Sequence, residues 1–257
     1  MNKYIYLIAL TFLCASSIAE AQDSTAVRSF FDEGLSMRGG VGSIAVRDEF
    51  ISDEKYNGSI PFFGVGWSRF HGTYGFRLIM EFQSTSNLKN YNLSAALTQF
   101  KLGLDYLYPI GDFQLMSRNV QVYLGPTSEL FIHYRQENIA QGGAIDAYSF
   151  LLLVSGGLRS EAWMPISSDL QLHANAQTSV ISLGGKLVDP ESTNESMVKL
   201  LTIFSGLNAN AGLGVSYRVT GGLVADASYR FDITRVNAWD FFISGNDNFI
   251  LSISYGF

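Results

Sequence analysis

The residues that could carry chemistry in this chain are histidines and carboxylates placed along segments of alternating polar and apolar side chains. His133 follows Glu129 by four positions on the same face, where the segment is expected to reach an outer rim, and Ser128 falls on the opposite face. A histidine oriented by a carboxylate can act as a general base, so this group supports the hypothesis of a hydrolase. His71 is expected at a short connection, and His173 is expected as a hydrogen-bonded interior residue.

A larger set of charged side chains shares one face of these segments. Both signs are interspersed, and charges in a surrounding of low dielectric constant need partners. We interpret the set as a salt-bridged polar interior, in preference to an open pore, because barrels of about eight to ten strands have little lumen to spare. With His173, its members are Arg77, Glu81, Lys101, Asp105, Glu129, Arg159, Glu161, Arg218, Asp226, Arg230 and Asp232.

The first 21 residues have the layout of a secretory signal peptide. Lys3 precedes an apolar stretch, residues 4–13, and the small residues Ala19 and Ala21 supply a cleavage site. The apolar stretch is shorter than the roughly 20 residues that a membrane-spanning helix needs. We therefore expect export and a single domain at residues 22–257.

Composition excludes several classes of function. Cys14, the only cysteine, lies within the signal peptide, so the exported chain is expected to hold no disulfide, thiol nucleophile or thiolate metal site. The net charge of −6 carries no basic stripe, which argues against nucleic-acid binding. No cofactor and no metal are expected.

The segments that contain the charged residues are predicted to be strands. In residues 73–83, Phe76, Leu78 and Met80 fall on one face while Arg77 and Glu81 fall on the other, which is the separation that a strand produces. Ten segments are candidate strands: residues 35–47, 60–70, 73–83, 97–109, 120–133, 148–161, 170–180, 207–219, 223–233 and 248–257.

The connections alternate between long and short, which predicts an up-and-down antiparallel meander. Long links are expected at residues 48–59, 84–92, 134–147, 184–204 and 235–247, and short ones at 71–73, 110–119, 164–169 and 220–222. The short links contain turn formers such as Pro, Gly and Asp. In the fourth long link, four apolar residues fall on one face at helical spacing: Met197, Leu200, Leu201 and Phe204. We expect a short helix or a strand extension that covers the rim, or alternatively an apolar patch for a partner or a lipid-like ligand.

Three features favour a transmembrane barrel over a soluble periplasmic β-protein. The polar faces are rich in Gly, Ser, Asn and Gln, which suits an enclosed interior. The strands and alternating links match the pattern of outer-membrane barrels. Aromatic residues form two girdles. The girdle at the short turns comprises Trp67, Tyr74, Tyr106, Tyr108, Trp163, Tyr217 and Tyr255, and that at the long links Phe82, Tyr148, Phe150, Tyr229, Phe231 and Phe249.

With the signal peptide, the even strand number, the girdles and the final strand, the chain resembles small Gram-negative outer-membrane β-barrel proteins. The Ala-Glu-Ala/Gln-Asp junction and the lack of cysteine look like the small outer-membrane barrels of Bacteroidota. The resemblance implies that Phe249, Tyr255 and Phe257 form a signal read by the barrel-assembly machinery. It implies outer-membrane lipid and lipopolysaccharide as surroundings, so deleting Phe257 is expected to damage assembly before any activity.

The expected fold is thus an all-β transmembrane barrel of ten strands, or of eight if a weak pair such as residues 35–70 is lost. The expected role is structural, ligand-binding or that of a narrow, porin-like pore, without enzymatic activity, and the long links are expected to contact the environment or another envelope component. The alternative is a barrel-borne surface hydrolase, a protease or lipid-modifying enzyme. No Asp-x-His pair resembling that of the ten-stranded surface proteases occurs in the sequence.

Overall fold

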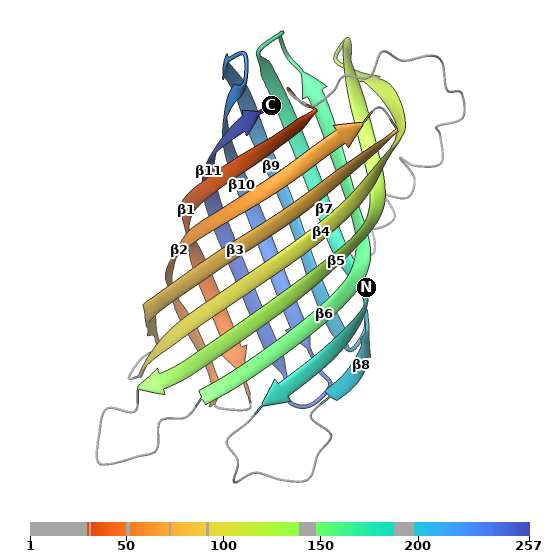
Figure 1. Ribbon diagram of the computed structural model, residues 1–257. Helices are drawn as coiled ribbons and strands as arrows, with labels where there is room; N and C mark the ends of the chain where they lie inside the picture. The colour runs from red at the N-terminus through yellow and green to blue at the C-terminus, as the bar shows by residue number, and fades with distance from the viewer. Residues whose placement is uncertain are drawn as a thin grey trace.

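The computed structural model of the protein is a closed barrel of antiparallel strands (Figure 1). It describes residues 30, 32–49, 52–71, 73–90, 93–138, 148–187 and 198–257. The predicted signal peptide lies outside these residues and stays a prediction. The strands are β1 (Glu33–Asp48), β2 (Ser52–His71), β3 (Tyr74–Lys89), β4 (Ser94–Leu115), β5 (Arg118–Asn138), β6 (Tyr148–Pro165), β7 (Leu170–Leu187), β8 (Val198–Thr202), β9 (Gly206–Thr220), β10 (Leu223–Val236) and β11 (Phe242–Gly256).

The sheet closes because β1 pairs with β11 and β6 pairs with β7. Strand β8 pairs with β7 beyond the stretch of β7 that β9 occupies, so β8 and β9 act as one interrupted strand. The ring therefore has ten strands, as predicted, and the eight-stranded alternative is wrong because β1 and β2 pair along their full length. The described residues include no helix long and apolar enough to cross a membrane.

Several strands extend beyond their predicted ends. Strand β2 begins at Ser52, β3 ends at Lys89 and β11 begins at Phe242, so parts of three predicted long links are paired strand. Alternation continues there, with Tyr56 and Leu88 buried inside the barrel. Most outward residues in these extensions are polar, such as Asn57 and Lys89, which made the segments look like loops. The short turns lie at the top of Figure 1 and the long connections at the bottom.

The helical spacing read in residues 197–204 was misleading, whereas the strand extension was correct. Val198–Thr202 forms β8, in which successive side chains point to opposite sides. Leu201 is 1% exposed and Leu200 is 67% exposed, so the two leucines do not share a face. Met197 lies outside the described residues.

The turn between β4 and β5 lies within the predicted short link at residues 110–119, but away from the turn formers of that link. Turn formers at residues 109–112 suggested the reversal, but the strand passes through them with an irregularity between Pro109 and Gly111. A bulge tolerates Pro109, which has no N–H to donate to the ladder. The chain reverses instead at Met116 and Ser117, whose φ angles are 50° and 62°.

Replacing Met116 and Ser117 by Asn and Gly is expected to stabilise the barrel. Both positions have the positive φ that two-residue hairpin turns of type I′ require, and side chains such as that of Met pay a steric cost there. We expect the free energy of unfolding to rise by about 1 kcal/mol. Urea unfolding in detergent micelles measures the change, and an Ala-Ala variant, which keeps the cost, should show no gain.

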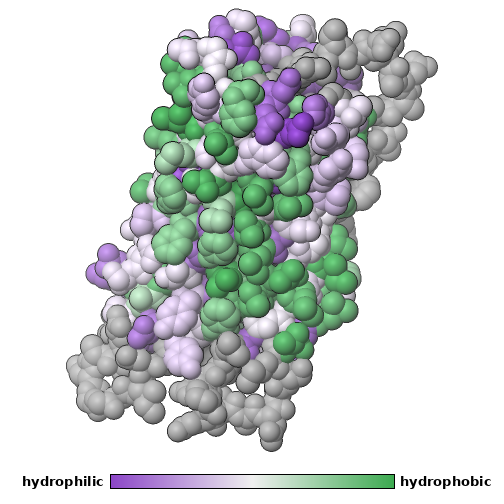
Figure 2. All heavy atoms as spheres, in the orientation of Figure 1, coloured by the Kyte–Doolittle hydropathy of each residue, from purple (hydrophilic) through white to green (hydrophobic). Residues whose placement is uncertain are grey.

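Apolar side chains cover the outside of the barrel. Figure 2 shows hydrophobic residues across the middle of the visible face, with hydrophilic ones gathered toward the ends. Leu78, Met80 and Phe82 point outward from β3, as predicted. In the girdle at the short turns, Tyr74 stacks on Tyr106 with ring centroids 5.3 Å apart.

Trp163 was wrongly placed in that girdle. It follows Glu161 by two positions and therefore shares the inward face of β6. Its ring lies 5.2 Å from that of His173 inside the barrel.

Candidate functional site

A cavity of about 200 Å³ occupies the barrel interior, and we call it the central cavity. Its lining includes every residue predicted for the polar interior except Arg218. These residues are Arg77, Glu81, Lys101, Asp105, Glu129, Arg159, Glu161, His173, Asp226, Arg230 and Asp232. Toward the short turns the lining includes serines and four aromatic residues, Phe30, Trp67, Phe70 and Trp163.

One ion network bridges the cavity on the side of the long connections. Arg230 donates to both carboxylate oxygens of Glu81, at 2.7 and 2.9 Å, and to Asp232 at 3.0 Å. Lys101 donates to the other oxygen of Asp232 at 2.9 Å, and Arg38 donates to Glu81 at 3.3 Å. All five side chains are less than one-fifth exposed, so each charge depends on its partners for compensation.

The geometry of this network ties opposite walls together. Lys101 on β4 and Asp232 on β10 come from strands that lie across the ring from each other. Glu129 on β5 accepts hydrogen bonds from Asn208 on β9 at 2.6 Å and from Gln177 on β7 at 3.2 Å. The interior of the barrel is thereby crossed by direct side-chain contacts.

A second ion network lies next to the first. Arg77 on β3 donates to Glu161 on β6 through both terminal nitrogens, one of them at 2.6 Å. Arg159 donates to Glu161 at 2.8 Å and lies 3.3 Å from Asp105, which also accepts from Thr127. The paired arginine and carboxylate groups give strong, directional bonds.

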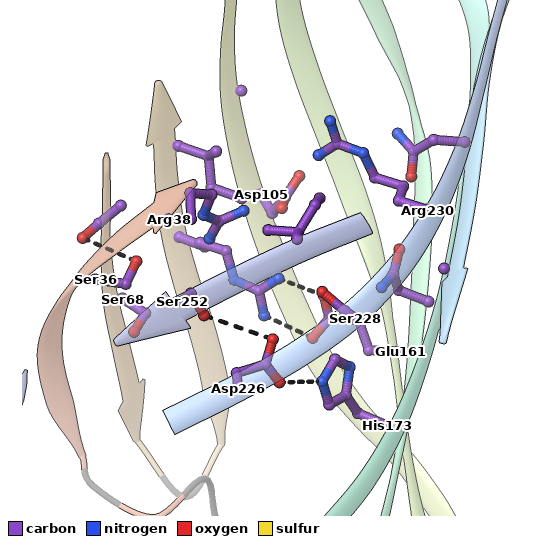
Figure 3. Close-up of a pocket in the computed structure, with 18 of the residues that line it drawn as sticks. Ser36, Arg38, Ser68, Asp105, Glu161, His173, Asp226, Ser228, Arg230 and Ser252 are labelled. Carbon is purple, nitrogen blue, oxygen red and sulfur yellow. Dashed lines mark hydrogen bonds and ion pairs between the residues drawn. The ribbon is translucent and has the colours of Figure 1, made fainter. Parts of the chain in front are cut away.

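His173 and Asp226 form a third cluster, toward the short turns. Nε2 of His173 lies 2.6 Å from Oδ2 of Asp226, and Figure 3 shows Asp226 joined also to Ser252. Ser216 donates to the same carboxylate at 2.8 Å, so this serine contacts the acid and not the histidine. A histidine that activates a serine nucleophile must contact that serine, so this cluster lacks the contact that nucleophilic catalysis requires.

Two glycines make room for these side chains. A Cβ on Gly214 would lie 2.4 Å from the imidazole of His173, and a Cβ on Gly64 would lie 2.9 Å from the side chain of Arg38. Both long side chains therefore lie flat against a neighbouring strand, and Arg38 reaches Glu81 across it.

His133 does not form the rim pair that the sequence suggested. It is fully buried, with Nδ1 3.1 Å from the amide nitrogen of Gln99 and its ring against Phe242. Glu129 is engaged by Asn208 and Gln177 instead. The strands extend beyond His133, so the position taken for the rim lies inside the barrel.

The sequence predicted a polar interior, but part of the interior is apolar. At the end with the long connections, inward-facing apolar side chains form a cluster, which we call the apolar core, and the buried ion pairs Lys186–Asp48 and Arg135–Glu137 lie at the same end. Trp239, from the connection between β10 and β11, packs against the apolar core. Its members, all at most 3% exposed, are Ile44, Val46, Tyr56, Ile60, Leu88, Ala95, Leu97, Phe131, Leu151, Leu153, Leu201, Val236 and Phe242.

Sequence reasoning missed two parts of this interior that carried a signal. Arg38 is an even number of residues from the inward-facing Ile44 and directly follows the exposed Met37. Alternation along β1 could therefore have placed Arg38 inside the barrel. Leu151 and Leu153 lie in an uninterrupted apolar run, which is typical of a strand with apolar surroundings on both faces.

The remaining predicted residues lie outside the cavity. Arg218 is near the end of β9 at the short turns, where its guanidinium stacks over Phe30 at 4.7 Å. Phe249, Tyr255 and Phe257, predicted as an assembly signal, are more than half exposed on the outer side. Among the described residues, no cluster of three His, Cys, Asp or Glu residues could hold a metal ion.

Comparison with known proteins gives similarity of fold alone. No model of a known protein family matches the chain, and no curated protein matches it. Solved structures of outer-membrane β-barrels are similar. Neisserial surface protein A (NspA) is 17% identical, with a TM-score of 0.38, over 87% of this chain and 97% of its own.

Two further structures show the same kind of similarity. The outer membrane protease OmpT from Escherichia coli is 11% identical, with a TM-score of 0.47, over 91% of this chain and 100% of its own. Ail, the attachment invasion locus protein of Yersinia pestis, is 10% identical, with a TM-score of 0.33, over 88% and 99%.

Proposed function

We propose that the protein is an integral outer-membrane barrel with a structural or ligand-binding role and without a continuous pore. The support for a membrane location is the outer surface. Leu35, Met37 and Val41 of β1 and Leu251 and Ile253 of β11 are all more than half exposed on adjacent strands. A soluble protein would expose such a continuous apolar band to water.

The height of this band fits a bilayer. In the last strand the outward residues are apolar or aromatic from Phe257 to Phe249, and the next outward residue is Asp247, which accepts from the Tyr229 hydroxyl at 2.6 Å. This interval of about nine residues matches the length of a transmembrane strand. Closure of the ring satisfies every strand edge, as lipid requires.

The apolar core is the main observation in favour of a barrel without a continuous pore. Its side chains occupy the lumen at one end, and the two ion networks bridge it further along. The central cavity, at about 200 Å³, has room for several water molecules or a small polar solute. We therefore favour binding or structural roles over the porin-like role.

Fractionation and solute entry test this proposal together. The full chain should be recovered in the outer-membrane fraction and should migrate faster in detergent gels before heating than after. Vesicles containing the folded protein should swell in sugar solutions no faster than empty vesicles. Recovery in a soluble periplasmic pool would contradict the membrane location, and rapid swelling would contradict the closed lumen.

The surface hydrolase has no specific observation in its favour and is not proposed. Its suggested histidine, His133, is buried and hydrogen-bonded to an amide. The resemblance to barrels of Bacteroidota rests on the lack of cysteine and on residues 19–23, which lie outside the described residues, and it stays a prediction.

A further inference from the structure

One wall of the central cavity carries small polar side chains around a single arginine. In the register of β1 and β11, Arg38 is paired with Ser252. Two residues earlier on β1, Ser36 is paired with Ser254, and all four residues line the cavity. Side chains of directly paired residues lie about 5 Å apart, so these hydroxyl groups and the guanidinium form one patch. We call this patch, Ser36, Arg38, Ser252 and Ser254, the serine wall.

The hydroxyl groups of the serine wall are only weakly engaged by the protein. Ser36 donates to the carbonyl oxygen of Gly66 at 3.4 Å, and Ser252 donates to Asp226 at 3.5 Å. A well-formed hydrogen bond from a hydroxyl group has a length of about 2.8 Å. Both serines can therefore exchange these long contacts for shorter ones with a group inside the cavity.

Arg38 and two amide groups also have unused hydrogen-bonding capacity. Figure 3 shows Arg38 pointing into the cavity, and its partner Glu81, at 3.3 Å, is already held through both oxygens by Arg230. A guanidinium has five N–H donors, so Arg38 can donate to a further acceptor. The buried amide oxygens of Asn175 and Asn210, which also line the cavity, have no hydrogen-bond partner among the described residues. A buried acceptor without a donor is costly, and a ligand hydroxyl in the cavity can supply the donor.

An aromatic side chain faces the serine wall from across the barrel. Trp163 belongs to β6, which is five strands from β1 in the ring of ten. Its ring lies 5.2 Å from that of His173, which contacts Asp226 at 2.6 Å. Asp226 in turn accepts from Ser252, so the indole and the serine wall lie at the same end of the cavity. A ligand between them meets an aromatic surface on one side and polar groups on the other, a combination typical of small-molecule sites.

The charges around the cavity are nearly balanced. The lining contains five arginine or lysine side chains and six carboxylates. Each of these carboxylates contacts a basic side chain, except Glu129, which accepts from two amides. A charged ligand would add a charge without a partner to this interior, which is costly, whereas a neutral ligand adds none.

We propose that the central cavity binds a neutral, polyhydroxylated ring of about the size of one monosaccharide. A cavity of about 150 Å³ can hold benzene, so about 200 Å³ accommodates one six-membered ring with hydroxyl groups. The ring packs against Trp163 and forms hydrogen bonds with Ser36, Arg38 and Ser252. This inference rests on the ligand-binding role proposed above and gives the chemical class of the ligand.

Calorimetric titration of the folded full chain with glucose tests the site, in micelles of lauryldimethylamine oxide, a detergent without a sugar group. The wild type should bind with a dissociation constant of about 1 mM or below, as expected for a ligand of this size. The variant Ser36→Ala/Ser252→Ala should bind about fivefold or more weakly, because two neutral hydrogen bonds are lost. Ser43→Ala is the matched control. Ser43 is exposed on the outer side of β1, and its replacement should leave the affinity unchanged.

Four outcomes would overturn the proposal. No binding at about 100 mM glucose would mean that the cavity holds only water. Equal affinity of the double variant and the wild type, or an equal loss in Ser43→Ala, would exclude the serine wall as the binding surface. Glucuronate or glucosamine binding more tightly than glucose would exclude a neutral ligand. Cyclohexanol binding as tightly as glucose would exclude recognition of several hydroxyl groups.

Failure of this inference is distinguishable from failure of the proposed function. Fractionation and vesicle swelling report on the membrane location and the closed lumen, and neither depends on a ligand in the cavity. Faster migration in detergent gels before heating than after should be retained in each serine variant, which shows that a lost affinity does not come from a barrel that fails to fold.

Discussion

Truncating Phe131 and Phe242 to alanine is expected to destabilise the barrel strongly. Both rings are at most 2% exposed within the apolar core, and Phe242 also packs against His133. Removing a buried phenyl ring costs about 3–5 kcal/mol, because apolar contacts are lost and a cavity remains. Unfolding in urea, followed by tryptophan fluorescence in lipid vesicles, measures the free-energy change for each single variant.

Phe82→Ala is the matched control for this prediction. Phe82 is 47% exposed on the outer side, where lipid can fill the space that the ring leaves. Its replacement should cost less than that of either interior phenylalanine. Equal costs at all three positions would mean that the apolar core contributes no packing beyond what lipid supplies.

Replacing Glu81 by leucine is expected to have an effect of similar size. Glu81 is 4% exposed and accepts from Arg230 and Arg38, so its loss leaves two arginines inside the barrel with reduced compensation. Breaking a buried ion pair from one side typically costs about 3–5 kcal/mol. The same unfolding assay gives the value.

The double variant Glu81→Leu/Arg230→Leu separates charge from packing. Removing both partners should restore part of the loss, because replacing a whole buried pair is far less costly than stranding one charge. Glu49→Leu breaks an exposed pair with Arg47 and should change stability by about 0–1 kcal/mol. A double variant less stable than Glu81→Leu would contradict the view that the arginine is stranded.

Much of the fold could be read from the sequence because a barrel wall has different surroundings on its two sides. Alternation in residues 73–83 and 97–109 predicted which side chains of β3 and β4 face inward, including Glu81 and Lys101. Period-two patterns report the face of a side chain directly, without knowledge of the partner strand.

The partners across the lumen could not be read in the same way. Lys101 and Asp232 are 131 residues apart, and their contact depends on the closure of the ring and the stagger of the strands. Alternation along each strand places both side chains inside the barrel, but it does not give their positions along the barrel axis. The apolar core escaped prediction because an apolar inward face and an apolar outward face give one continuous run, as at residues 150–154.

The turn at Met116 and Ser117 shows a different limit. Local turn chemistry at Pro109, Gly111 and Asp112 was stronger than at the actual reversal, where neither residue favours a positive φ. Pairing between β4 and β5 continues to Leu115 and Arg118, so the ladder between the two strands overrides the local preference.

Conductance across a planar bilayer tests the closed lumen most directly. The folded full chain, inserted into a lipid bilayer between salt solutions, should give no discrete current steps under an applied voltage, because the apolar core and the ion pairs beside it occupy one end of the interior. Discrete steps in the wild-type protein, with a size that changes in Arg77→Gln or Asp226→Asn, would contradict the account and show that ions pass through the interior.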